Sequence, residues 1–258
     1  MKLLIAITSI LLALCASTAP AQQVYQSESK SWKFTCPEGW QQIAFEIIKH
    51  RETQEREDWP DKVFTYIAGF TRGGMNTFTY PYILINRTEI DLTEVTYEDI
   101  EEGTNFPEEV KTNRDYALGT YMQEAFGPHG TVDRSRRLLV TWADGPDEQG
   151  LEVRCTLYTF LGAKQSIQFE CYDLKSNNDR NRAYFQAFVN SFEMRDDLKF
   201  VPTEGKSKFD KSNFKEESGR RYGRRGYTSS GGWGFRVYGL GGLVTLIASA
   251  IVWLIFKD

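Results

Sequence analysis

Residues 153–174 read VRCTLYTFLGAKQSIQFECYDL and contain the clearest structural pattern of the chain. On both sides of Gly162-Ala163-Lys164, apolar side chains recur at every second position, at Val153, Cys155, Leu157, Ile167, Phe169 and Cys171. Because successive side chains of a strand point to opposite faces, this spacing predicts a β-hairpin with one apolar face. The chain is therefore expected to contain an antiparallel sheet.

The same hairpin suggests a disulfide. If the turn centres on Ala163, Cys155 lies directly opposite Cys171, with α-carbons within the roughly 4.4–6.8 Å that a disulfide accepts. A Cys155–Cys171 bridge is predicted, with Cys36 left free and Cys15 removed with the N-terminal segment. In the alternative interpretation, all three remaining cysteines are small buried hydrophobic side chains.

Further elements follow from local patterns outside the hairpin. Residues 31–36 alternate apolar with polar side chains before Pro37-Glu38-Gly39, which predicts a strand and a tight turn. Thr96 followed by Asp99 is a capping box that opens a short helix. The charge-rich segment Glu46–Asp58 is interpreted as a solvated helix or loop. A helix capped at 177–179 is expected to bury one face, formed by Tyr184, Ala187, Phe188, Ser191 and Phe192.

Both ends of the 258-residue chain are hydrophobic. Residues 1–21 combine Lys2, an apolar core and Ala19-Pro20-Ala21, the pattern of a cleavable signal peptide. Residues 237–256 carry no charge and are long enough to span a bilayer as a helix, which leaves 257–258 as a tail. The main domain is therefore expected to be extracytoplasmic and membrane-anchored. A tail that is processed, as in glycolipid anchoring, is the alternative.

Charge is unevenly distributed between the predicted domain, residues 22–201, and the predicted flexible basic linker, residues 202–236. The linker holds nine Lys and Arg against four Asp and Glu, a net charge of +5, whereas the whole chain has −4. The domain is consequently acidic. Acidic domains bind nucleic-acid phosphates poorly, so nucleic acid is excluded as a partner.

Two contact surfaces are predicted near the anchor. The first is a membrane or other anionic surface contact made by the linker arginines Arg220, Arg221, Arg224 and Arg225. The second is a stripe of small residues in the span, which lets two helices pack closely and form a homodimer; it consists of Gly241, Thr245 and Ser249.

No catalytic, cofactor or metal signature is found along the chain. His50 and His129 have no ligand at a metal-site spacing and are expected at the surface. The acidic segment 91–102 lacks the alternating ligands of a calcium loop and is interpreted as a solvated helix face. Asn86-Arg87-Thr88 fits an N-glycosylation acceptor.

The opening Trp32-Lys33-Phe34-Thr35-Cys36-Pro37-Glu38-Gly39-Trp40 resembles the start of PsbP-like domains, which share a fold with the Ran-binding Mog protein. A long hairpin at 153–174 that leads into a helix ending in Ser191-Phe192 resembles the end of that family. The resemblance implies an α+β fold, an antiparallel sheet flanked by helices, here with a C-terminal transmembrane helix. It also implies non-enzymatic roles.

Two functional hypotheses follow. The first is a non-catalytic binding or assembly module at the outer face of a membrane, for an envelope or membrane-complex partner protein, with no cofactor. The alternative is a secreted, membrane-tethered enzyme with an acidic or thiol site.

Overall fold

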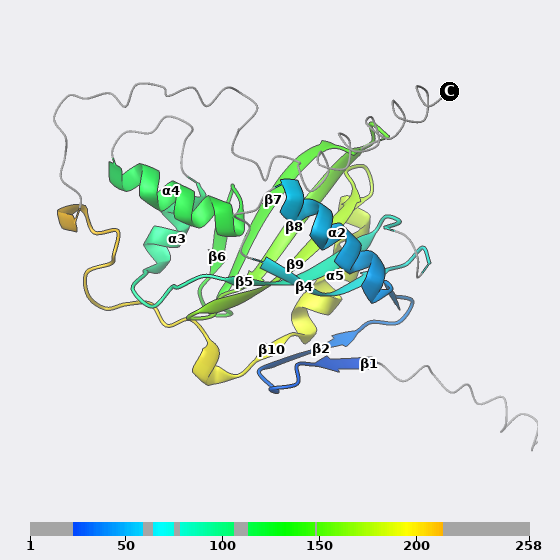
Figure 1. Ribbon diagram of the computed structural model, residues 1–258, viewed down its shortest axis with the longest axis horizontal. Coiled ribbons are helices and arrows are strands. Elements are labelled where there is room, and N and C mark those ends of the chain that lie inside the picture. The colour runs from blue at the N-terminus through cyan, green and yellow to red at the C-terminus, as the bar shows by residue number, and fades with distance from the viewer. Residues whose placement is uncertain (1–22, 59–63, 75–77, 106–112, 148, 214–258) are drawn as a thin grey trace, which may run out of the picture.

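The structure is a computed structural model that describes residues 23–58, 64–74, 78–105, 113–147 and 149–213. Its main element is an antiparallel sheet with the strand order β3-β4-β5-β9-β8-β7-β6 (Figure 1). In that order the strands are Gln41–Gln42, Phe64–Thr71, Tyr82–Glu89, Gln165–Leu174, Glu152–Phe160, Leu138–Pro146 and Thr131–Asp133. A second sheet has the order β1-β2-β10, with strands Gln23–Gln26, Trp32–Cys36 and Glu193–Met194.

Helices cover both faces of the large sheet (Figure 1). One face packs against the small sheet and α5 (Asn178–Ser191). The other face packs against α2 (Phe45–Asp58) and, farther along, against α3 (Tyr97–Thr104) and α4 (Asn113–Phe126). Two 3-10 turns, Asp196–Leu198 and Lys211–Asn213, follow α5. The predicted α+β class, with an antiparallel sheet flanked by helices, is confirmed.

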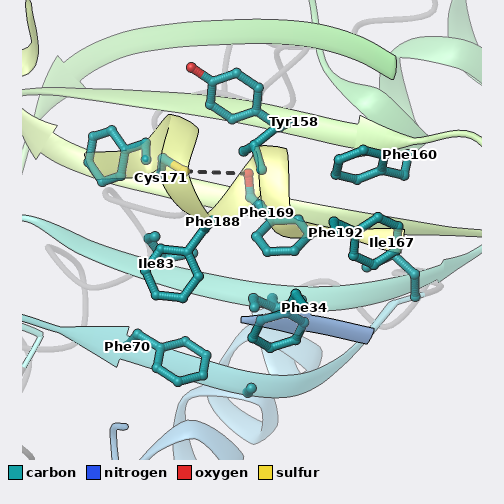
Figure 2. Packing of buried hydrophobic residues seen from close by; sticks show 14 of the residues in the cluster. Phe34, Phe70, Ile83, Tyr158, Phe160, Ile167, Phe169, Cys171, Phe188 and Phe192 are labelled. Atoms are coloured by element: carbon teal, nitrogen blue, oxygen red, sulfur yellow. Dashed lines mark hydrogen bonds between the residues drawn. The ribbon is translucent and has the colours of Figure 1, made fainter. Parts of the chain in front are cut away.

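Aromatic rings join the small sheet and α5 to the large sheet (Figure 2). Phe34 of β2 is central: its ring centroid lies 5.6 Å from that of Phe169 on β9 and 5.8 Å from that of Phe70 on β4. Phe188 of α5 lies 6.3 Å from Phe34 and 5.2 Å from Phe70. All four side chains are buried. The Trp32–Cys36 strand therefore contributes directly to the core.

The hairpin at 153–174 is confirmed, but its register differs by one residue from the prediction. Cys155 pairs with Tyr172, and Thr156 pairs with Cys171. The segment between the last pair, Phe160 and Ile167, contains an even number of residues, so no residue lies at its centre. A shift of one residue moves a side chain to the opposite face of the sheet. Cys171 therefore lies beneath α5 and Cys155 beneath α2, and the predicted disulfide is wrong because both thiols are free.

Two predicted helix starts are found in the structure. The capping box is confirmed: Asp99 N donates to Thr96 Oγ1 at 3.1 Å, and Thr96 N donates to Asp99 Oδ2 at 2.9 Å. Helix α5 also begins as expected, but its buried face is rotated by about one residue. Phe185 and Phe188 are buried, whereas Tyr184 is 40% exposed.

Residues 202–213, which we call the strap, were predicted to belong to the flexible linker, yet they pack against the domain. Phe209 is 5% exposed and lies in the apolar cluster of α3 and α4. Thr203 N donates to Val95 O at 3.1 Å. The overall composition of residues 202–213 is that of a linker and does not reveal that one aromatic side chain, Phe209, is buried. The predicted linker therefore begins too early.

Candidate functional site

Several predicted features lie outside the described residues: the signal peptide at 1–21, the four linker arginines Arg220, Arg221, Arg224 and Arg225, and the small-residue stripe Gly241, Thr245 and Ser249. Within the described ranges, no helix combines the length and hydropathy needed to cross a bilayer. The predicted span at 237–256 is not among those ranges.

The three described cysteines are buried, free and poorly suited to nucleophilic chemistry. Burial raises the pKa of the Cys36 thiol to about 11. Burial also raises the pKa of Cys155 and of Cys171 well above the ordinary value. Because the thiolate is the nucleophile, these residues behave as small core side chains, as the alternative interpretation of the sequence held.

We predict that none of these three thiols reacts readily in the folded protein. With a pKa of about 11, about a thousandth of Cys36 is thiolate at pH 8, and access is restricted as well. Alkylation followed by mass spectrometry should modify all three cysteines only after denaturation. Rapid labelling of one thiol in the native protein, or a disulfide in a non-reducing peptide map, would contradict this.

Helix α2 turns charged side chains toward the sheet, contrary to the expectation that this segment is solvated. Arg51, Glu52 and Glu55 are buried, whereas Phe45 is 50% exposed. Arg51 Nε donates to Glu55 Oε1 at 2.9 Å, and its Nη1 donates to Tyr82 OH at 3.4 Å. The sheet beneath α2 supplies polar partners, which make burial of these charges possible.

Glu170 of β9 lies at the centre of this arrangement. Its Oε1 accepts from Asn86 Nδ2 at 2.6 Å, and its Oε2 accepts from Tyr172 OH at 2.8 Å and lies 3.2 Å from Tyr66 OH. Burial raises the pKa of both tyrosines well above the ordinary value, so they remain hydroxyls. We call the whole set the polar cluster: Arg51, Glu55, Tyr66, Tyr82, Asn86, Glu170 and Tyr172.

The polar cluster contains Asn86, the residue of the predicted glycosylation acceptor. Asn86 is fully buried in β5, and its Nδ2 donates to Gln168 Oε1 at 3.1 Å as well as to Glu170. An enzyme could not reach this amide in the folded domain. The sequence motif at 86–88 therefore does not mark a surface acceptor here.

An exposed aromatic side chain stands out on the opposite face of the sheet. Trp142 of β7 is 40% exposed, and its ring centroid lies 4.9 Å from that of His129, with the rings nearly parallel. The Arg154 guanidinium lies 4.8 Å from the Trp142 ring. His129 and His50 are both exposed, as predicted. No sequence motif singled out Trp142.

Asp144, next but one along β7, fixes the basic side chains beside Trp142. Arg154 donates to both Asp144 oxygens, at 2.6 and 2.8 Å, and Lys175 Nζ lies 3.0 Å from Oδ2. The hydrogen bond from Arg154, followed by that from Lys175, lowers the pKa of Asp144. We call His129, Trp142, Asp144, Arg154 and Lys175 the tryptophan patch.

The acidic segment 91–102 is engaged in structural contacts. Glu102 pairs with Arg114 at 2.8 Å, and Glu101 pairs with Arg134 at 3.1 Å. Among the described residues, no group of three His, Cys, Asp or Glu side chains is arranged to hold a metal ion.

No family model and no curated protein matches this chain. Among solved structures, cyanobacterial PsbP from Synechocystis is similar over 70% of this chain and 97% of its own, with 11% identity and a TM-score of 0.37. A protein from Bacteroides thetaiotaomicron is similar over 67% of this chain and 48% of its own, with 7% identity and a TM-score of 0.39. The Ran-binding protein Mog1p of Saccharomyces cerevisiae is similar over 75% and 98%, with 6% identity and a TM-score of 0.33.

Identities and TM-scores this low transfer no function to the present chain. PsbP and Mog1p are nevertheless proteins of the kind that the motifs at 32–40 and 153–192 resemble.

Proposed function

We propose that this chain is a non-catalytic binding or assembly module, anchored at the outer face of a membrane by residues 237–256, that holds a protein of an envelope or membrane complex. The observation that carries the proposal is the tryptophan patch. Trp and Arg are both enriched among the residues that contribute most to protein–protein affinity. Trp142 is exposed and held between fixed neighbours, so ordering it on binding costs little entropy.

The buried groups argue against the alternative enzyme. A thiol enzyme needs an accessible cysteine of low pKa, whereas burial raises the pKa of Cys36, Cys155 and Cys171. The carboxyl groups of Glu55 and Glu170 are buried between α2 and the large sheet and are hydrogen-bonded within the polar cluster. The binding module therefore accounts for more of the described features.

The end of the strap limits how far the domain can move from its proposed anchor. Residues 214–236 separate the strap from the predicted span. A flexible segment of that length has a root-mean-square extent of roughly 25–30 Å. On this proposal the domain stays close to the bilayer. The linker arginines contact anionic headgroups, and the Gly241, Thr245 and Ser249 stripe pairs two copies.

The proposal is tested by site-specific photo-crosslinking in the native membrane. A photoreactive residue at position 156, opposite Trp142 on the neighbouring strand β8, should capture a reproducible partner protein. Trp142→Ala should weaken that partner's binding by about 2 kcal/mol or more, as expected for a hot spot. Tyr184 provides the matched control, because it is also 40% exposed and is stacked on an arginine, Arg72, at 4.0 Å.

Tyr184→Ala should leave capture unchanged. Equal loss of capture in both variants, or no reproducible partner captured from position 156, would contradict the proposal. Crosslinking to a second copy alone would make the surface a dimer contact.

A further inference from the structure

Strand β1 is an edge strand of the small sheet and lies at the margin of the molecule (Figure 1). Its register with β2 determines which of its main-chain groups are used. Ser27 N donates to Trp32 O at 3.1 Å, and this pair continues the register of the two strands. Because hydrogen-bonded pairs alternate along an antiparallel ladder, Tyr25 bonds to β2, whereas the N–H and C=O of Val24 and Gln26 point away from it.

The opposite side of β2 is consistent with this alternation. Thr35, which lies opposite Val24, turns both of its main-chain groups away from β1. Its N–H donates to Ser191 Oγ at 3.0 Å, and its C=O accepts from the same hydroxyl at 3.1 Å. Within the described ranges, no hydrogen bond is made to the main chain of Val24 or of Gln26. Each of these two residues therefore presents one donor and one acceptor along the open edge.

The edge of β1 lacks the features that usually block the addition of a strand. Natural edge strands carry charged side chains, prolines or bulges. Residues 23–27 contain neither a charge nor a proline, and β1 pairs with β2 without a bulge. The side chains of Val24 and Gln26 are exposed, Val24 by 60%. The edge is therefore accessible to another strand.

The main chain of β4, near the other end of the molecule's strand order, is protected in a different way. Tyr66 N donates to Glu52 Oε2 at 2.9 Å, and Phe64 O accepts from Arg56 Nη2 at 2.8 Å. Side chains of α2 thus bind main-chain groups of β4. No helix does the same for the described residues of β1.

We propose that β1 pairs with β1 of a second copy of this chain about a two-fold axis, which joins the two small sheets. In an antiparallel pairing with Tyr25 at the axis, Val24 of each copy lies opposite Gln26 of the other. Each of these two pairs exchanges two hydrogen bonds, so the contact makes two times two, or four, bonds. Every outward donor and acceptor of Val24 and Gln26 is then satisfied, as a two-fold contact requires.

The self-complementarity of the edge favours a second copy as the occupant. Val24 and Gln26 are both uncharged, so the pairing places no like charges opposite each other. Tyr25 packs on the core cluster of the domain, and the pairing leaves that contact in place. The affinity comes from the main-chain bonds, as in other cases of strand addition.

The size of the contact indicates where the pairing occurs. Three residues from each copy bury far less than the roughly 1,600 Å² of a stable interface, so the pairing needs a high local concentration. Two copies tethered to one membrane have such a concentration. In this respect alone the inference rests on the proposed function.

Crosslinking tests the register. Full-length Val24→Cys and Gln26→Cys proteins with different tags are mixed in liposomes and treated with a short thiol-specific crosslinker. The two tags should become linked. Lys33→Cys mixed with Lys33→Cys is the matched control, because Lys33 lies beside Gln26 on β2, is also exposed, and is one strand farther from the axis. The control should be linked at least about tenfold less, since each strand adds about 4.8 Å.

Hydrogen exchange resolved to single residues tests the main-chain bonds. The amides of Val24 and Gln26 should exchange about tenfold more slowly when the protein-to-lipid ratio is raised, whereas the Tyr25 amide, already bonded to β2, should not change. Val24→Pro removes an outward donor but leaves the ladder to β2 intact. It should abolish the dependence at Gln26, and Val24→Ala should retain it.

The proposal would be overturned if the Val24 and Gln26 positions crosslink no better than the Lys33 control, or if exchange at Gln26 does not depend on the protein-to-lipid ratio. Capture of a different protein alone, from a photoreactive residue at position 24 in the native membrane, would also overturn it. Flotation with the liposomes tests the anchor separately. If the protein does not float, the same crosslinking at about millimolar protein in solution decides the pairing. None of these measurements involves Trp142.

Discussion

Phe34→Ala is expected to lower the free energy of unfolding by about 3–5 kcal/mol. Phe34 is 1% exposed, and its ring contacts Phe70, Phe169 and Phe188, which belong to three different elements. Removing it leaves a cavity where the small sheet, the large sheet and α5 meet, and these elements cannot all move inward to fill it. Equilibrium urea denaturation of the full-length protein measures the loss.

Val24→Ala on the neighbouring strand β1 is the control, since Val24 is 60% exposed. That variant should change the free energy of unfolding by no more than about 0.5 kcal/mol. A loss below about 1 kcal/mol for Phe34→Ala would mean that β1 and β2 pack loosely on the domain.

Arg51→Met is expected to cost about 3–5 kcal/mol of stability, because it leaves the Glu55 carboxylate buried without the guanidinium that binds it. Arg56 on the same helix provides the comparison. It pairs with Glu52 at 3.3 Å, but its side chain is 47% exposed. Arg56→Met should therefore cost about 1 kcal/mol or less.

The double variant Arg51→Met, Glu55→Gln separates the loss of the ion pair from the cost of leaving the Glu55 charge buried and unpaired. It should recover part of the loss, because the uncompensated charge is gone. Denaturation at one fixed pH measures all three proteins. Equal costs for Arg51→Met and Arg56→Met would show that the polar cluster is open to water.

The sequence predicted what depends on local chemistry. The capping box at 96–99 and the turn at 37–39 involve residues close together in the chain, and both the helix and the strand next to them are found. The alternation through 153–174 likewise identified a hairpin. It did not reveal whether the turn contained an odd or an even number of residues, and that number decides whether Cys155 and Cys171 lie on the same face of the sheet.

Other features depended on distant parts of the chain. The polar positions of β9, among them Gln168 and Glu170, resemble a solvent face in isolation, yet they are buried on the face of the sheet against which α2 packs. The sequence of α2 likewise suggests a solvated helix, because its charged residues have no partners nearby in the chain. In the structure, Arg51 and Glu55 contact tyrosines of β4, β5 and β9. The polar cluster could not be predicted from α2 alone or from the strands alone. The polar groups of α2 can be buried because the strands provide their hydrogen-bond partners, and the reverse holds as well.

The strap has a mechanical consequence for a tethered protein. Any pull on the chain beyond Asn213 is applied first to the strap, at Phe209 and at the hydrogen bonds from Thr203 and Lys208 to residues 95 and 94. These contacts join the strap to the α3–α4 end of the domain rather than to the strands of the large sheet. Under tension the strap should peel away before the sheet deforms. Detachment of the strap would lengthen the tether and lower the tension on the rest of the domain, which protects it from forced unfolding.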